Sequence, residues 1–208
     1  MTHKMLRLGL TGGIASGKTA VAAMLCELGF AVLDADSLAH KLIEPGQPAY
    51  DEVVREFGPS ILDAGNRVDR AKLASIVFAD PAKLARLNAI LHPRVETIIY
   101  HQFAEWSRNG ARDAAFVEAA LLVEAGYHKN LDGLVVTWSR PEQQLERLRA
   151  RGFTDEDARR RIAAQLPVAE KLRHATEKID CSGSLEATRA QVAALAAKLR
   201  RSSTKMSS

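Results

Sequence analysis

The stretch "LGLTGGIASGKTAVAAML", residues 8–25, decides the fold because it joins two apolar segments through a glycine-rich loop. Gly12, four further residues, and then Gly17, Lys18 and Thr19 match the pattern G-x-x-x-x-G-K-[ST]. An apolar strand pattern precedes the loop and the amphipathic segment "TAVAAMLCELG" follows it, which is the context that this pattern requires. The stretch therefore predicts a phosphate-binding loop between a strand and a helix.

The chemistry of the loop follows from its backbone. Glycines let N–H groups turn inward as an anion nest, and the N-terminus of the following helix adds about half a positive charge. Lys18 can reach the β and γ phosphates of a nucleotide, and the Thr19 hydroxyl can bind Mg²⁺. We expect the nucleoside triphosphate to contact Gly12, Gly13, Ala15, Ser16, Gly17, Lys18, Thr19 and Ala20.

Composition narrows the class of protein. The 208 residues carry a net charge of +4, which equals the charge on four cations near the chain ends, Lys4, Arg200, Arg201 and Lys205. No basic groove interleaved with aromatic residues is visible, so we expect no nucleic-acid partner. No apolar segment approaches the roughly 18 residues of a membrane span, and two cysteines are too few for a disulfide framework. These features predict a cytoplasmic protein with free thiols and no membrane contact, and they leave any protein partners unknown.

The order of apolar and helical segments predicts an α/β fold, a five-stranded parallel sheet flanked by helices. Short β-type runs occur at "LRLGL", "FAVLD", "AAFVE", "GLVVTW" and, more weakly, "KIDCS". We expect a single domain whose nucleotide-binding core spans about 5–36, 112–140 and 175–200. A helical insertion would occupy 37–111, broken near Pro93, and a helical lid 141–174. The basic tail, 201–208, is expected to be disordered.

The loop alone does not decide the reaction, since kinases, GTPases and motor ATPases share it. No guanine-recognition signature follows the later strands. Glu118, at the end of a predicted strand, keeps a motor ATPase possible, whereas the arginines between 147 and 161 favour a kinase lid that closes over the transferred phosphate. Within that lid, Thr154 and Asp157 are spaced as the N-cap and N3 residues of a helix.

Two carboxylates follow the second predicted strand, in "LDADSLAH". The carboxyl ends of parallel strands face the ligand in an open α/β sheet, so Asp34 or Asp36 could accept the proton of an acceptor hydroxyl or order the waters of Mg²⁺. A cap on the following helix is the structural alternative for either residue.

Beyond the loop, the segments "DADSLAH", "VDRAKLASIVFADP", "LNAILHPRV", "ALLVEAG", "RRRIAAQ" and "IDCSGSLEATRAQV" occur in order along nearly the whole chain. Together they resemble the dephospho-CoA kinase family. The resemblance implies that ATP, with Mg²⁺, phosphorylates the ribose 3′-hydroxyl of dephospho-CoA in the final step of coenzyme A biosynthesis. It also implies that the helical insertion binds the acceptor.

The resemblance assigns roles residue by residue. Lys18 matches the phosphate lysine, Asp36 the residue that activates the acceptor hydroxyl, and Arg147 the lid arginine at the transferred phosphate. His92 and Arg94, in "HPRV", would contact the CoA side, and for His92 a structural turn is an equal alternative. An ATPase or regulatory domain, or a kinase for another small acceptor, remains the alternative function.

The chain departs from the family pattern at three places. Ala120 stands where a proline is usual, before "LL", and Cys181 stands where an asparagine is usual, in "DCSG". The segment "RLRARGF" is one residue shorter than the usual lid sequence, which leaves the choice among Arg147, Arg149 and Arg151 open. The expected consequences are local: a changed backbone at 120 and a changed contact near the adenine base at 181.

Overall fold

A computed structural model describes residues 5–109 and 113–205, and within them the chain divides into two compact units. The sheet unit comprises residues 5–33 and 102–205, and the helical unit is Asp34–His101. The helical unit thus begins three residues before the expected insertion and ends inside a long helix. The expected end of the insertion, at 111, lies outside the described residues.

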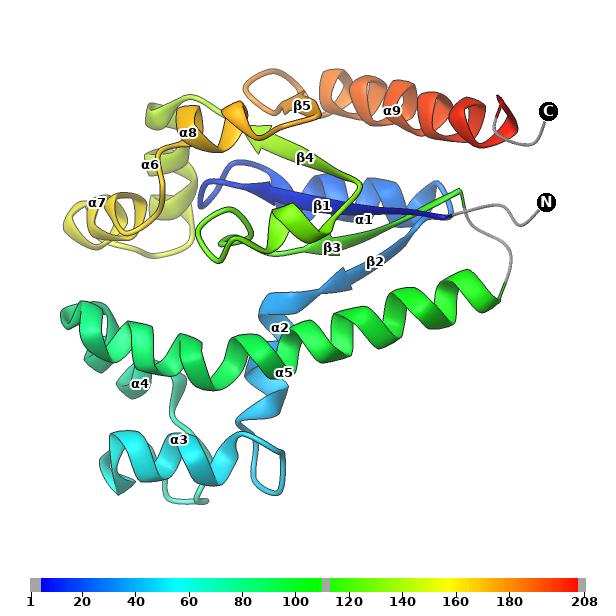
Figure 1. Cartoon of the computed structure of the whole chain (residues 1–208). Coiled ribbons are helices and arrows are strands. Elements are labelled where there is room, and N and C mark those ends of the chain that lie inside the picture. Colours follow the sequence, from blue (N-terminus) through cyan, green and yellow to red (C-terminus); the bar gives the residue numbers. More distant parts are fainter. Residues whose placement is uncertain (1–4, 110–112, 206–208) are drawn as a thin grey trace. The chain divides into compact units, whose positions relative to one another are not determined.

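The sheet unit is built on five strands, β1 (Leu6–Gly12), β2 (Ala31–Asp34), β3 (Ala114–Glu118), β4 (Gly133–Trp138) and β5 (Glu177–Asp180). Their order is β2-β3-β1-β4-β5 and the sheet is parallel, which confirms the predicted fold class (Figure 1). Because β1 lies at the centre, the loop that follows it is flanked by the carboxyl ends of β3 and β4.

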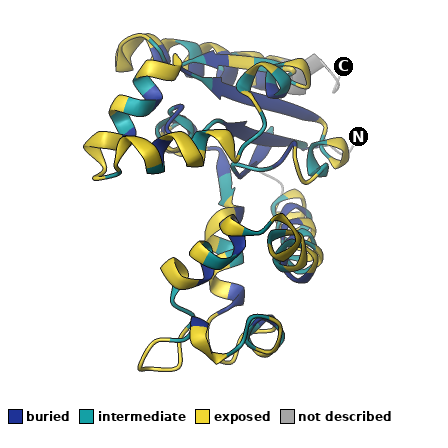
Figure 2. Cartoon of the chain, turned by 90° about the vertical axis from the view of Figure 1, so that its left-hand side faces the viewer, coloured by how far each residue is buried: buried dark blue, intermediate teal, exposed yellow. Residues whose placement is uncertain are grey.

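The main core lies on one face of this sheet, under α1 (Lys18–Glu27) and α9 (Leu185–Lys205). Both helices are apolar on the side that meets the strands, and the three central strands β1, β3 and β4 are largely buried, as Figure 2 shows. The largest fully buried residues of this core are Phe116, Leu10 and Leu25.

On the opposite face of the sheet, Leu122 and Leu131 approach Gly9 of β1 closely. The short helix η2 (Tyr127–Asn130) belongs to the same connection.

The lid comprises α6 (Pro141–Ala150), α7 (Asp155–Ala163) and α8 (Val168–Arg173). Gly152 makes the turn between the first two with φ of +87°, a conformation that favours glycine. The hydroxyl of Thr154 accepts a hydrogen bond from the Asp157 N–H at 3.2 Å, which confirms the predicted N-cap of α7.

The helical unit contains α2 (Ala35–Leu42), α3 (Tyr50–Phe57), η1 (Pro59–Ile61), α4 (Arg70–Ala79) and most of α5 (Pro81–Arg108). Asp69 caps α4 by accepting from two backbone N–H groups. The helices enclose a small apolar core made of Leu42, Ile43, Ala49, Val53, Ile61, Leu73, Val77, Ile90, Leu91, Val95 and Ile99.

The two long helices correct two expectations. We expected a break near Pro93, but α5 runs through it, because burial of Ile90, Leu91 and Val95 outweighs one lost backbone hydrogen bond. The tail was expected to be disordered from 201, but α9 continues to Lys205, helped by Arg200, which donates to the Leu28 carbonyl at 2.7 Å. Residues 206–208 lie outside the described part. In the described ranges, no helix has the length and apolar character needed to cross a membrane.

Candidate active site

The phosphate loop, residues 12–19, has the backbone of an anion site. Ala15 and Gly17 adopt left-handed conformations, with φ of 59° and 95°. Gly17 is the N-cap of α1 and offers no side-chain cap, and the first turn of this helix carries no acidic residue. Since the first N–H groups of a helix lack intrahelical acceptors, this helix end is suited to a phosphate.

Close packing explains the glycines at both ends of the loop. A Cβ atom on Gly12 would lie 2.2 Å from Thr137 Oγ1 and 2.5 Å from Ser16 Oγ. One on Gly17 would lie 2.8 Å from both Cβ and Sγ of Cys181. The loop therefore tolerates side chains at neither position, for reasons of space at Gly12 and of space and backbone conformation at Gly17.

Cys181, where the family usually has asparagine, is buried against the phosphate loop. Burial raises the pKa of its thiol, so the side chain stays neutral beside the anion site. The Cys181 side chain therefore limits the space at Gly17, and the changed contact near the adenine base stays a prediction.

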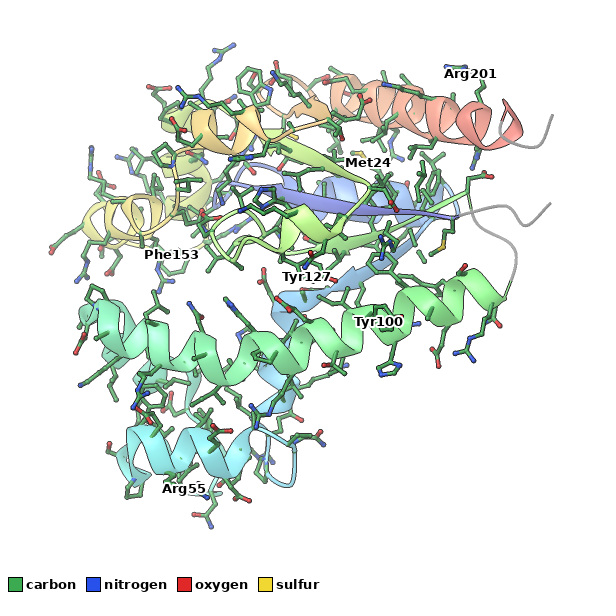
Figure 3. The ribbon with its side chains drawn as sticks, viewed as in Figure 1. Met24, Arg55, Tyr100, Tyr127, Phe153 and Arg201 are labelled. Carbon is green, nitrogen blue, oxygen red and sulfur yellow. The ribbon has the colours of Figure 1, made fainter. Side chains whose placement is uncertain are left out.

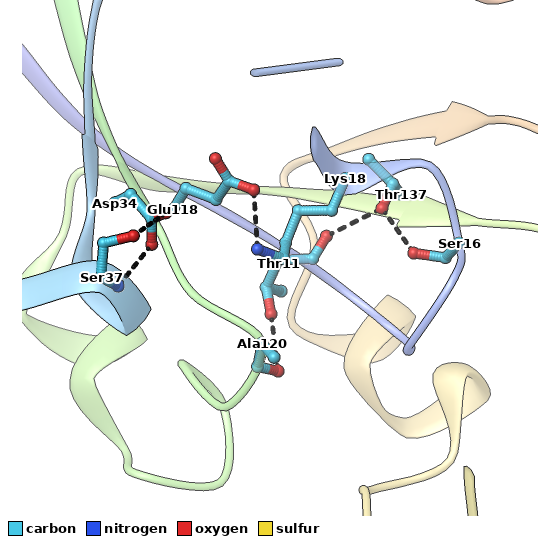
Figure 4. A network of polar contacts seen from close by, with 8 residues as sticks. All are labelled: Thr11, Ser16, Lys18, Asp34, Ser37, Glu118, Ala120 and Thr137. Atoms are coloured by element: carbon cyan, nitrogen blue, oxygen red, sulfur yellow. Dashed lines mark hydrogen bonds and ion pairs between the residues drawn. The ribbon is translucent and has the colours of Figure 1, made fainter. Parts of the chain in front are cut away.

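A buried polar network fixes the base of the loop (Figure 4). The Ser16 and Thr137 hydroxyls are hydrogen-bonded at 2.8 Å, and Thr137 also donates to the Thr11 carbonyl at 3.3 Å. Thr11 in turn donates to the Ala120 carbonyl at 3.2 Å. Because the Ser16 side chain is turned into this network, the part of Ser16 suited to meet a phosphate is its backbone.

Lys18 is paired with Glu118, at the end of β3. Its Nζ lies 2.7 Å from Glu118 Oε1, and the two side chains are 15% and 8% exposed. A largely buried lysine held by a carboxylate next to an anion nest is placed to exchange that carboxylate for phosphate oxygens. Thr19, on the first turn of α1, is exposed.

The loop after β3 is held by a fully buried lysine of the lid. Lys171 of α8 donates to the Ala120 carbonyl at 2.6 Å and pairs with Glu124 at 2.8 Å, with its side chain 0% exposed. Glu124 also accepts from the Leu166 N–H at 3.0 Å. Ala120, which replaces the usual proline, is therefore fixed through its carbonyl by Thr11 and Lys171.

The lid arginines separate into different environments. Arg147 donates to the carbonyls of Ala15 and Cys181, at 2.9 and 2.7 Å, and so bridges the phosphate loop and the segment after β5. Arg149 pairs with Asp155 in two hydrogen bonds, and this pairing raises the pKa of the guanidinium and lowers that of the carboxyl. Arg151, at the turn, is exposed.

The two strand-end carboxylates have different roles at α2. Asp34 is the N-cap, with Oδ1 accepting from the Ser37 N–H at 2.9 Å and Oδ2 from the Ser37 hydroxyl at 2.6 Å. Asp36 lies on the first turn of α2 and is exposed. The cap alternative therefore holds for Asp34 and not for Asp36.

His92 and Arg94 flank Pro93 on α5. Burial lowers the pKa of His92, so its imidazole is neutral at neutral pH. Arg94 donates to the Ile90 carbonyl at 2.5 Å and pairs with Glu52 at 2.6 Å, which ties α5 to α3. The turn that was the structural alternative for His92 is absent, because the described helix α5 is continuous there.

The structure brings the loop residues, Lys18, Thr19 and Arg147 together in the sheet unit, while Asp36, His92 and Arg94 belong to the helical unit. In the sequence, Glu118 suggested only a motor ATPase, although its place at a strand end was a usable signal for this site. Gln144 and Gln165, which both contact Ile14 of the loop, were not predicted. No local pattern marks either glutamine, since their partner lies more than a hundred positions away.

A phosphate loop after the central strand of a parallel sheet, beside an arginine-rich helical lid, defines a kinase of the phosphate-loop class. Residues 6–187 match the family model described as dephospho-CoA kinase. Relatives named dephospho-CoA kinase include one from Symbiobacterium thermophilum, 47% identical over 90% of this chain and 78% of that protein. One from Aquifex aeolicus is 46% identical over 90% of this chain and 94% of its own.

A solved structure supports the same assignment. The dephospho-CoA kinase from Campylobacter jejuni is 26% identical, with a TM-score of 0.70 over 94% of this chain and 98% of that one. The chain belongs to the dephospho-CoA kinase family, whose reaction is the final step of coenzyme A biosynthesis. The sequence left a kinase and an ATPase or regulatory domain as alternatives, and membership in a phosphotransferase family favours the kinase.

Proposed function

We propose that this chain transfers the γ-phosphoryl group of ATP to the ribose 3′-hydroxyl of dephospho-CoA, giving coenzyme A and ADP. The observation that carries the proposal is the phosphate loop, an anion nest at an uncapped helix N-terminus, in a chain of the dephospho-CoA kinase family. The backbone of residues 12–20 would hold the phosphates, with Gly12, Gly13 and Gly17 allowing close approach and Ala15, Ser16 and Ala20 contributing backbone groups.

Lys18 would stabilise the charge that develops on the β and γ phosphates. Its pairing with Glu118 at 2.7 Å holds the ammonium at the carboxyl end of the sheet. When a triphosphate enters, the lysine gains a more highly charged partner, and Glu118 is left beside the phosphates, where it can order water or a cation. We therefore add Glu118 to the candidate site.

The residues suit a Mg²⁺ ion that arrives with the nucleotide. Thr19 presents an exposed hydroxyl on the first turn of α1, and Glu118 offers a carboxylate at the neighbouring strand end. Such oxygen donors suit Mg²⁺, which keeps several waters and binds through substrate phosphates. When bound, the ion would supply positive charge to the phosphate oxygens.

Asp36 is proposed as the base that accepts the proton of the 3′-hydroxyl. Its neighbour Asp34 uses both carboxylate oxygens to cap α2 through Ser37, whereas Asp36 is exposed on the first turn. His92 and Arg94 are proposed to contact the acceptor. His92 would do so as a neutral hydrogen-bonding group, and Arg94 by exchanging Glu52 for a phosphate of the acceptor.

Arg147 is the proposed contact to the transferred phosphate. Its two hydrogen bonds to the Ala15 and Cys181 carbonyls hold the guanidinium at the edge of the phosphate loop. Exchanging one carbonyl for a phosphate oxygen would strengthen that bond, because both partners would then be charged. The reaction is proposed to take place in the cytoplasm, where the thiols of Cys26 and Cys181 stay reduced.

The proposal is tested with the acceptor itself. The protein, Mg²⁺ and ATP are incubated with dephospho-CoA or with its 3′-deoxy analogue, and the products are resolved by mass spectrometry and ³¹P NMR. We expect one phosphate to be added to dephospho-CoA and none to the analogue. Phosphorylation of the 3′-deoxy compound would contradict the assignment of the hydroxyl.

Asp36→Asn and Asp34→Asn form a matched pair for the base. We expect the first to lower kcat by about a hundredfold or more, and the second to change kcat and stability little, because asparagine caps a helix as well as aspartate does. Unchanged kcat with a raised KM for dephospho-CoA in Asp36→Asn would show that Asp36 only positions the acceptor.

A further inference from the structure

Two glutamines from different parts of the lid bind the two polar backbone groups of one phosphate-loop residue, Ile14. Gln144 of α6 donates through Nε2 to the Ile14 carbonyl at 2.9 Å. The Ile14 N–H donates to Oε1 of Gln165, which follows α7, at 2.7 Å. The peptide groups on both sides of Ile14 are therefore held from the lid.

Further contacts join the same surfaces. Arg147, one turn after Gln144 on α6, donates to the next carbonyl of the loop, that of Ala15, at 2.9 Å. Ala15 also belongs to a small apolar cluster with Leu148 and Ala158 of the lid, against which Ile14, Leu145, Phe153 and Ile162 pack. Phe153, labelled in Figure 3, lies in the turn before α7. The lid helices and the tip of the loop thus share one core.

These contacts bear on the conformation that an anion nest needs. Ala15 has a φ of 59°, which is unfavourable for a residue with a Cβ atom and persists only where the surroundings impose it. The peptide group between Ile14 and Ala15 carries the carbonyl that Gln144 binds, and the carbonyl of Ala15 itself is bound by Arg147. With the carbonyls drawn outward, the N–H groups that follow can face inward.

We propose that Gln144 and Gln165 are positioning residues. They hold Ile14 from α6 and from the segment after α7, and thereby keep the phosphate loop in its nucleotide-binding conformation. The inference rests on the proposed use of ATP, and ATP binding by the unaltered protein tests that use separately. Neither glutamine needs to touch the nucleotide. Their effect is to lower the cost of ordering the loop when the phosphates arrive.

The opposite polarity of the two hydrogen bonds supplies a matched test. Gln165 accepts with its amide oxygen, so glutamate of the same shape keeps the bond. Gln144 donates with its amide nitrogen, so glutamate places an oxygen against the Ile14 carbonyl oxygen and loses it. Both changes add the same negative charge beside the same residue, so the difference between them reports the hydrogen bond.

The experiment compares Gln144→Glu, Gln165→Glu and Gln165→Leu with the unaltered protein. The measurements are the KM for ATP, kcat with dephospho-CoA, the Kd for ATP, and the Tm without nucleotide. We expect Gln144→Glu to raise the KM and Kd for ATP about tenfold more than Gln165→Glu does. Gln165→Leu should weaken ATP binding about tenfold, and Gln165→Glu should restore much of it.

Two results would overturn the proposal. Equal weakening of ATP binding by both Gln→Glu changes would show that charge, and not the hydrogen bond, matters. A lowered Tm with unchanged KM and Kd for ATP would show a role in folding only. If Gln144→Glu does not fold, the Gln165→Leu and Gln165→Glu pair decides the question, and failure of the unaltered protein to bind ATP would instead refute the proposed function.

Discussion

The phosphate loop and the helical unit are stabilised by different kinds of contact. Several polar groups of the loop tip are bound by residues far along the chain, as in the Ile14–Gln144 and Ser16–Thr137 contacts, 130 and 121 positions apart. Around its apolar core, the polar contacts of the helical unit are helix caps and partly exposed ion pairs, such as the Asp69 cap and the Arg94–Glu52 pair. The loop should therefore respond sharply to single changes and the helical unit mildly.

The largest effect is expected at Lys18. Lys18→Ala should lower kcat by about a hundredfold to a thousandfold, because it removes positive charge from the transferring phosphate. Arg7→Ala, which removes an exposed cation from β1 and its pair with Asp132, is the matched control and should leave kcat within about twofold. Steady-state kinetics of both variants checks this. A near-normal kcat in Lys18→Ala would show that Lys18 does not stabilise the transferring phosphate.

The next effect separates a buried ion pair from an exposed one. Lys171→Met should lower the free energy of unfolding by about 3 kcal/mol, because it removes the buried ammonium that pairs with the Glu124 carboxylate and one of the two donors to the Ala120 carbonyl. Arg94→Met breaks a pair whose side chains are 33% and 45% exposed, and should cost at most about 1 kcal/mol. Urea unfolding measures the free energy of unfolding of both variants. Similar losses in Lys171→Met and Arg94→Met would contradict the difference expected between the buried and the exposed ion pair.

Glycine substitutions sharpen the same comparison. Gly12→Ala should cost about 2–3 kcal/mol and disturb ATP binding, since its Cβ would lie 2.2 Å from Thr137 Oγ1. Gly46→Ala, in the helical unit, has a φ of +80° but no heavy atom within 4 Å, so only backbone strain of about 1 kcal/mol is expected. Thermal unfolding with and without ATP tests both variants. A larger loss of stability in Gly46→Ala than in Gly12→Ala would contradict the expectation that the loop is the more sensitive region.

The smallest effect is a dependence on pH in the helical unit. Burial lowers the pKa of His92 in the folded protein, so the unfolded chain binds that proton more readily. The free energy of unfolding is therefore unaffected by His92 at pH values above the ordinary histidine pKa, near 6.5. It declines as the pH falls through 6.5 toward the lower pKa of His92 in the folded protein. His92→Gln should reduce the loss of stability between about pH 7.5 and 5.5 in urea titrations. An unchanged loss would exclude His92 as a source.

The sequence predicted the elements that local patterns mark. The strand, loop and helix around Gly12–Lys18, the parallel sheet and the N-cap at Thr154 were all visible as spacing or periodicity. The continuation of α5 through Pro93 was not visible in the sequence, because no local pattern showed that Ile90, Leu91 and Val95 would be buried around the proline. Glu118 was visible as a strand-end acid, but its pairing with Lys18 depends on the order of strands in the sheet.

The supports of the loop were beyond local reasoning. In the sequence, Gln144 and Gln165 look like ordinary polar residues, and only the fold brings them to Ile14. The same holds for Lys171, which in the sequence resembles a solvated lysine next to Glu170 and in the structure is fully buried. Motifs thus indicate where a ligand binds, while long-range packing determines how firmly the site is held.

The central claim is that the γ phosphate held by this loop goes to an alcohol and not to water. The most direct test is a coupled assay that monitors ADP formation by the protein in the presence of Mg²⁺ and ATP, with and without dephospho-CoA. We predict rapid ADP formation that requires dephospho-CoA and yields one coenzyme A for each ADP. Equally fast ADP release without the acceptor would contradict the account.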